Sequence, residues 1–103
     1  MKLLAIMRPP EGADVTSLVA ARARDELGVL WQLYRDGFVR EMYSPGAPGA
    51  VLVLEAESAA SAAAELARLP LLEGNVMRLE LIELHPFSAL EMLFSRPEGT
   101  SSS

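Results

Sequence analysis

One glutamate of this sequence stands where a core-facing side chain is expected. Between residues 15 and 36 there is no proline, and apolar residues fall on one half of a helical wheel. Glu26 lies near the centre of that apolar half. A carboxyl group withdrawn from water has a raised pKa, which suits it to proton transfer near neutral pH. Glu26 is therefore the first candidate for a catalytic residue.

Two other interpretations of Glu26 remain open at this point. Arg22 lies one helical turn earlier on the same side, so the two side chains could form a structural ion pair. Alternatively, the helix face that carries Glu26 reaches solvent or a partner chain. Buried acids often belong to structural ion pairs, so position alone does not establish a catalytic role.

His85 is the only histidine of the chain and stands directly before Pro86. At the end of a predicted strand it could act as a general acid or base, or orient a ligand. The alternative is a histidine that only makes a hydrogen bond at the strand end.

Aromatic residues are the next candidates for a binding site. Trp31 and Tyr34, together with Phe38 and Tyr43, could line an apolar ligand pocket between helix and sheet. Core packing or dimer contacts are the alternative role for such aromatics.

Three arginines lie on different predicted strands, namely Arg8, Arg40 and Arg78. If their strands present them on one face, they could converge on a carboxylate substrate. Solvated or interface arginines are the alternative.

Composition excludes several classes of function. The 103 residues include 9 basic and 14 acidic side chains, for a formal charge of −5, so nucleic acid and anionic membranes are poor partners. With no cysteine and one histidine, we expect no metal site and no cofactor. The apolar run at the N-terminus is too short for a signal peptide or a membrane span, so we expect a cytoplasmic protein.

The elements that must position these residues follow from the apolar pattern and the turn residues. The pattern predicts strands over residues 3–7, 38–43, 50–55 and 76–84, and helices over residues 15–36 and 59–69. Ser58 is the predicted N-cap of the second helix, and Pro70 its end. Residues 88–94 are expected to form a short apolar helix or arm.

The order βαββαβ is typical of an α+β, ferredoxin-like domain, a four-stranded antiparallel sheet with two helices on one face. We expect a single domain over residues 1–95 and a mobile tail over residues 96–103. The strands contain more apolar side chains than one covered face needs. The opposite face is therefore expected to pack against a second copy, which gives a homodimer built sheet to sheet.

Four short segments of the chain resemble the muconolactone isomerase family of dimeric α/β barrels. They are Asp25-Glu26, Arg35-Asp36-Gly37, Leu69-Pro70-Leu71 and His85-Pro86-Phe87-Ser88. The resemblance implies a ferredoxin-like protomer, a dimer or larger homo-oligomer, and a cofactor-free proton shift in a small unsaturated lactone of aromatic catabolism. It also implies that Glu26 handles the proton. The chain departs from the family in the first strand and the loop after it, which lack a match to the basic residues that bind the acidic substrate, so Arg8 or Arg22 would have to replace them.

Three functions are consistent with these residues. In an isomerase, Glu26 removes a proton next to a lactone carbonyl and returns it to another carbon, while Arg22 or His85 stabilises the enolate. Trp31 and Tyr34 then contribute to substrate binding. The second function is a non-catalytic oligomeric module that binds a small ligand or serves as an accessory subunit. The third is a cofactor-free oxygenase of the same architecture.

Overall fold

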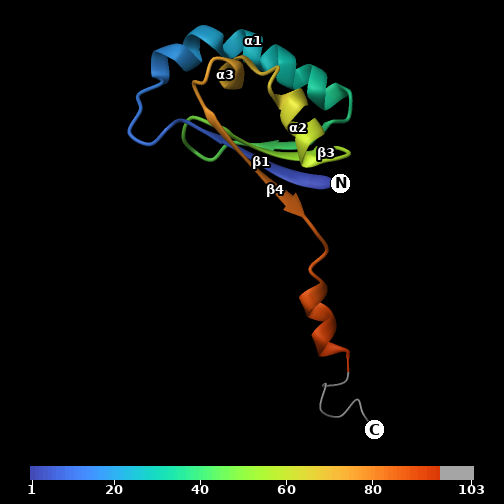
Figure 1. Cartoon of the computed structure of the whole chain (residues 1–103). Helices are drawn as coiled ribbons and strands as arrows, with labels where there is room; N and C mark the ends of the chain where they lie inside the picture. The colour runs from blue at the N-terminus through green and yellow to red at the C-terminus, as the bar shows by residue number, and fades with distance from the viewer. Residues whose placement is uncertain (96–103) are drawn as a thin grey trace.

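The computed structural model describes residues 1–95, and the predicted tail over residues 96–103 lies outside this range. Within it, β1 (Lys2–Arg8), β2 (Val39–Tyr43), β3 (Ala50–Glu55) and β4 (Arg78–Leu84) form one antiparallel sheet in the order β2-β3-β1-β4. The helices α1 (Thr16–Arg35) and α2 (Ala59–Leu66) cover one face of it (Figure 1). The predicted α+β, ferredoxin-like arrangement is confirmed.

The core lies between the helices and the sheet, and the strand sequences explain why. Side chains of a strand alternate between its two faces. On β1, Leu3, Ala5 and Met7 face the helices and are fully buried, whereas Leu4 and Ile6 face the other way and are half-buried. Leu52 and Leu54 continue the buried set on β3. One face of the sheet thus carries the core, and the other is left uncovered.

The long helix α1 buries a narrower stripe than its apolar half suggests. Leu30 and Leu33 are buried with Glu26, but Leu18 and Leu27, also on the predicted apolar half, are 47% and 63% exposed. When a helix packs on a sheet, only the side chains on the arc of the helix that contacts the sheet are buried. Glu26 falls inside this arc, so its predicted core-facing position is confirmed.

The second helix begins as predicted and ends earlier. Ser58 and Ser61 form a capping box, in which the Ser58 hydroxyl accepts a hydrogen bond from the Ser61 amide at 3.0 Å. The predicted end at Leu69 is wrong, because α2 stops at Leu66. The residue before a proline avoids the helical conformation, and Leu69, which precedes Pro70, has an extended backbone.

A short third helix, α3 (Pro70–Glu73), follows between the second predicted helix and the last predicted strand, where no helix was predicted. Pro70 occupies its first turn, where the missing amide hydrogen costs no helical hydrogen bond. In Figure 1, α3 lies directly beneath α1, and the two helices are in contact. The segment therefore closes one end of the space between α1 and the sheet.

The uncovered face of the sheet, which we call the open face, carries apolar side chains in its middle and charged side chains around them, among them Lys2, Arg8 and Glu80. Its apolar side chains are Leu4, Ile6, Val51, Val53, Ile82 and Leu84. After β4 the chain continues into a 3-10 helix, η1 (Ser88–Leu93), that extends away from the body (Figure 1). No helix within residues 1–95 combines the length and the hydropathy needed to cross a membrane.

Replacing Gly49 should destabilise the fold. Gly49 precedes β3 with a φ of 139°, and a Cβ atom there would collide with the carbonyl oxygen of Met7. We expect Gly49→Ala to lower the free energy of unfolding by about 1–3 kcal/mol, measured by chemical denaturation. The control is Gly28→Ala in α1, where no neighbour lies within 4 Å. That change should stabilise the protein by roughly 0.5–1 kcal/mol. Equal effects of the two changes would contradict this account.

Candidate functional site

Glu26 is a buried acid in the middle of α1. Its side chain is 6% exposed and is the only buried charged side chain of residues 1–95. The helix position explains the burial, because Leu30 lies one turn further along the same side and packs into the core. Burial of this one carboxyl group therefore costs the folded protein free energy, because the group loses its hydration.

One hydrogen bond to the Glu26 carboxyl group is found within residues 1–95. The backbone amide of Leu71 donates to Glu26 Oε1 at 3.0 Å, and this bond is buried. Leu71 belongs to the first turn of α3, where amide hydrogens have no partner within the helix. The bond therefore satisfies two buried groups at once and leaves the Glu26 side chain directed into the interior.

Burial raises the pKa of Glu26 above its usual value of 4.5. The hydrogen bond from the Leu71 amide opposes this effect, because it stabilises the charged form, but burial is the larger influence. A carboxyl group with a raised pKa binds a proton more firmly than an exposed one. It is therefore better suited to exchange protons with carbon acids near neutral pH.

A cavity of about 180 Å³ lies beside Glu26, between α1 and the sheet. Its other walls are apolar or backbone groups from α1, α3 and the adjacent ends of the strands. The lining residues are Met7, Val19, Ala23, Glu26, Leu27, Leu30, Gly49, Ala50, Leu71 and Met77. Glu26 is the one ionisable residue among them.

The size and lining of this cavity define what it can accept. An apolar cavity of about 150 Å³ is large enough for benzene. The Glu26 cavity therefore admits a molecule with a single five- or six-membered ring. Among the lining residues, the only ionisable group that can exchange a proton with such a ligand is the Glu26 carboxyl.

The alternative that Glu26 forms an ion pair with Arg22 is wrong. No salt bridge joins these two side chains, and the carboxyl group instead accepts the Leu71 amide. Arg22 is half-buried beside the end of α3. A Cβ atom built on Gly74 would lie 3.5 Å from Cζ of the Arg22 guanidinium. Arg22 therefore approaches the site from the α3 side without lining the cavity.

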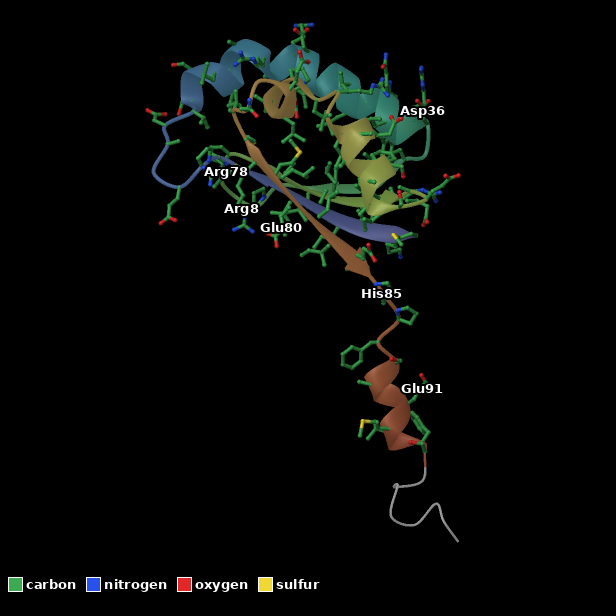
Figure 2. All side chains as sticks on the ribbon, viewed as in Figure 1. Arg8, Asp36, Arg78, Glu80, His85 and Glu91 are labelled. Carbon is green, nitrogen blue, oxygen red and sulfur yellow. The ribbon has the colours of Figure 1, made fainter. Side chains whose placement is uncertain are left out.

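Arg8 lies on the opposite face of the sheet from Glu26. Met7 lines the Glu26 cavity, and the side chain of the next residue in a strand points to the other face. Arg8 pairs in register with Arg78 of β4 on that open face (Figure 2). Two of the three arginines thus come together, but they do not meet Glu26 within one protomer.

His85 is also remote from Glu26. It follows the last residue of β4 at the far end of the strand (Figure 2), whereas Met77, which lines the cavity, precedes its first residue. At 3.2–3.4 Å per residue, the intervening strand separates them by about 26 Å. The exposed His85 side chain instead lies 3.3 Å from the Glu83 carboxylate. Within one protomer, His85 and Glu26 cannot act on the same small molecule.

The two aromatic candidates on α1 lie together but outside the cavity. Trp31 and Tyr34 stack with their ring centroids 5.9 Å apart, and they are 58% and 43% exposed. Neither ring lines the cavity beside Glu26. They form an exposed aromatic pair on the outer side of the helix.

Two features of the site were not predicted from the sequence. The Leu71 amide holds Glu26, and Gly49 allows the turn before β3 to meet β1 at the cavity wall. The segment Leu69-Pro70-Leu71 is one of the four that resemble the muconolactone isomerase family, but its pattern carries no sign of a hydrogen bond to α1. Across residues 1–95, no group of three or more His, Asp or Glu side chains is arranged to hold a metal ion.

Comparison with known proteins finds likeness in structure alone. No family model matches the sequence, and no curated protein matches it. A solved muconolactone isomerase is 23% identical, with a TM-score of 0.64 over 85% of this chain and 94% of that one.

A second similar structure is 5-chloro-2-hydroxyhydroquinone dehydrochlorinase from Burkholderia phenoliruptrix AC1100, in complex with 2,5-dihydroxybenzoquinone. It is 14% identical, with a TM-score of 0.65 over 82% of this chain and 94% of that one. At these identities the two structures show that the chain shares their fold.

The raised pKa of Glu26 makes the stability of the protein depend on pH. In the unfolded chain the carboxyl group ionises near its usual value, whereas in the folded protein it holds its proton to higher pH. The wild type should therefore lose stability relative to Glu26→Gln as pH rises from the pKa of Glu26 in the unfolded chain through its higher pKa in the folded protein. Urea denaturation of both proteins at a series of pH values measures this difference. A difference that stays constant, or that grows in favour of the wild type, would contradict the raised pKa.

Proposed function

We propose that this protein is a muconolactone isomerase-like, cofactor-free enzyme that shifts a proton within a small unsaturated lactone or a related intermediate of aromatic catabolism. The observation that carries the proposal is the Glu26 carboxyl group, buried at an apolar cavity and held by a single backbone amide. Such a group can take a proton from carbon and keep it out of water until it is returned.

The reaction is written as two proton transfers on one carboxyl group. The Glu26 carboxylate removes a proton from the carbon next to the lactone carbonyl, so that a C–H bond breaks and an O–H bond forms. The released electron pair is delocalised into the carbonyl and the conjugated double bond as a dienolate. Glu26 then delivers the same proton to another carbon of that system, so the substrate and the product have the same atoms.

The shape of the cavity supports a single-ring substrate. Its volume of about 180 Å³ suits one small ring, and its lining is apolar except for Glu26. An apolar wall disfavours the charged carboxylate in the free protein, which increases its basicity in the reaction. The Leu71 amide keeps Oε1 in place, so the second carboxyl oxygen, Oε2, is the one we assign to the proton.

Arg22 is the residue we propose for binding the negative charge of the substrate or of the enolate. It lies one helical turn before Glu26, half-buried beside Gly74 at the end of α3. Its guanidinium forms no salt bridge within residues 1–95, so no ion pair holds it away from the cavity. Arg8 and His85, which lie away from this cavity, would serve substrate binding only at a site shared with a second copy.

The structural comparisons support this choice of chemistry. One similar structure is a muconolactone isomerase, and the other is a dehydrochlorinase that was solved with 2,5-dihydroxybenzoquinone. Both names denote enzymes for small ring compounds, which the Glu26 cavity can also accommodate. We further propose that the protein works in the cytoplasm, where such metabolic intermediates are processed.

A homodimer built through the open face is part of the same proposal. Leu4, Ile6 and Ile82 present apolar side chains on a sheet face that no element of residues 1–84 covers. An antiparallel sheet can leave one face to water when that face is polar, but the middle of this face is apolar, with charged side chains such as Lys2, Arg8 and Glu80 around it. Packing against the same face of a second copy would remove these side chains from water.

A non-catalytic module that binds a small ligand is the alternative function. It is favoured by the apolar cavity lining, in which no basic side chain accompanies Glu26 to stabilise an enolate. In that case Glu26 would serve only to anchor α3 through the Leu71 amide. Ligand binding without turnover would then be retained in a variant that keeps this hydrogen bond.

Removing the acid of Glu26 should abolish isomerase activity. We expect the purified protein to convert muconolactone in a spectrophotometric assay, and Glu26→Gln to lower kcat by at least about 100-fold. Glutamine keeps the shape and can still accept the Leu71 amide, but it cannot carry the proton. Because the pKa of Glu26 is raised, activity should also fall as pH drops through that raised value.

The control for this assay is Asp25→Asn. Asp25 is the adjacent acid on α1 and is exposed, so the variant loses the same charge without touching the cavity. Its kcat should stay within about twofold of the wild type. If muconolactone turns over equally well in Glu26→Gln, Glu26 is not the proton carrier. No turnover in any of the three proteins excludes this substrate.

Light scattering measures the proposed assembly. At micromolar concentration we expect a particle of two or more chains, since the apolar open face is buried only by association. A particle of 11.1 kDa, the mass of one chain, would overturn the sheet-to-sheet homodimer.

A further inference from the structure

Two arginines stand next to each other at one end of the sheet. Arg8 is the last residue of β1 and Arg78 the first of β4, and they lie directly opposite in the antiparallel register. Side chains so placed have Cβ atoms about 4.5–5.5 Å apart, and like charges there destabilise a sheet. Both side chains are exposed at the end of the open face (Figure 2). We call these two residues the arginine pair.

The acids nearest to the arginine pair do not neutralise it. Glu80 shares the open face, since it lies opposite Ile6 in the register, and Glu11 belongs to the loop after β1. Within residues 1–95, no salt bridge or side-chain hydrogen bond joins either acid to the pair. The guanidinium groups, with five N–H donors each, are therefore available to an anion from solution.

An open hollow of about 500 Å³ lies against the arginine pair. It is bounded by the ends of β1 and β4 and by the loop that follows β1. The lining residues are Ile6, Arg8, Pro9, Pro10, Glu11, Arg78, Leu79 and Glu80. The pair thus borders a space that can hold a small molecule.

A second hollow, of about 360 Å³, lies toward β3, on the other side of β1 from β4. Its lining comes from β1, β3 and the loop between β2 and β3, and consists of Ile6, Met7, Arg8, Pro9, Pro45, Ala47, Pro48 and Val51. Arg8 is the one charged residue among them. The two hollows share Ile6, Arg8 and Pro9, so one molecule bound at Arg8 can reach both.

We propose that the two hollows together bind a small organic carboxylate that carries an apolar body. Arginine donates two parallel hydrogen bonds to a carboxylate, so an anion between Arg8 and Arg78 would replace their repulsion by attraction. The apolar body would lie in the second hollow, against Pro45 and Pro48. Inorganic phosphate could contact the arginines but would leave the apolar hollow empty.

This site is distinct from the Glu26 cavity, and its ligand is not the proposed lactone. The Arg8 side chain points to the open face, away from Glu26, and the linings of the two sites have only Met7 in common. The arginine pair also lies outside the apolar middle of the open face. An interface built on that middle would leave the pair at its rim, which is accessible to solvent. The inference therefore goes beyond the proposed function.

An NMR titration of the ¹⁵N-labelled full-length protein tests the inference. The probes are benzoate, acetate, which lacks an apolar body, and inorganic phosphate. We expect benzoate to bind with a dissociation constant of about 1 mM or lower, at least about tenfold more tightly than acetate or phosphate. Amide shifts should change mainly over residues 6–11, 45–51 and 78–80. No binding of benzoate, or phosphate binding that is equally tight, would overturn the inference.

Two arginine variants separate the site from general charge effects. We expect Arg78→Gln to raise the dissociation constant of benzoate at least about tenfold, because a charged hydrogen-bond donor is lost. The control is Arg24→Gln. Arg24 is an exposed arginine of α1 that forms no salt bridge within residues 1–95 and lines neither hollow. Its dissociation constant should stay within about twofold of the wild type. Equal losses of affinity in the two variants would contradict a role of the arginine pair.

The result is separable from the isomerase proposal. Benzoate should bind Glu26→Gln within about twofold of its affinity for the wild type. Benzoate binding lost in Glu26→Gln but kept in Arg78→Gln would place the ligand in the Glu26 cavity and overturn the inference. Benzoate binding at the arginine pair in a protein that turns over no lactone would establish this site and remove the enzyme. Lactone turnover without benzoate binding would do the reverse.

Discussion

The hydrogen bond from the Leu71 amide to the Glu26 carboxyl group is the interaction on which the candidate site depends. It joins residues 45 positions apart and is buried. Without it, the core would contain an acid with no partner and α3 would begin with a buried amide that lacks an acceptor. With it, α3 is fixed beneath α1, and Leu71 becomes one wall of the cavity. The same hydrogen bond thus satisfies the buried acid and places Leu71 in the cavity wall.

The sheet separates this site from the surface that we propose for association. On β1, Met7 faces the cavity, whereas Ile6 and Arg8 face the open side. The strand β1 therefore takes part both in the Glu26 cavity and in the open face. This arrangement explains why the charged candidates Arg8 and Arg78 meet each other and not Glu26.

Much of the fold could be predicted from the sequence because it follows from local rules. Alternation on β1, the Ser58 cap and the periodicity of α1 each depend on nearby residues, and the periodicity alone predicted that Glu26 faces the core. The end of α2 was misjudged because Pro70 acts through Leu69, whose backbone it holds extended. Periodicity also overstated the buried arc of α1, since it does not tell how much of the apolar half the sheet covers.

The parts of the site that escaped prediction depend on contacts between distant residues. No local pattern reports that the Leu71 amide points at Glu26, or that Gly49 must approach the Met7 carbonyl. The position of His85 is likewise fixed by the length of β4, which places it about 26 Å from the cavity. The helical pattern therefore predicted the burial of Glu26, but the three-dimensional arrangement decided which of the other candidates lie near it.

The account depends most on Glu26 being a buried carboxyl group that holds its proton more firmly than an exposed glutamate. A ¹³C NMR titration of the Glu26 side-chain carboxyl carbon measures this property directly, with Asp25→Asn used to exclude the neighbouring acid from the assignment. We predict a midpoint above 4.5, the usual value for glutamate, because burial outweighs the Leu71 hydrogen bond. A midpoint at or below 4.5 would contradict the account and leave Glu26 as a structural anchor for α3.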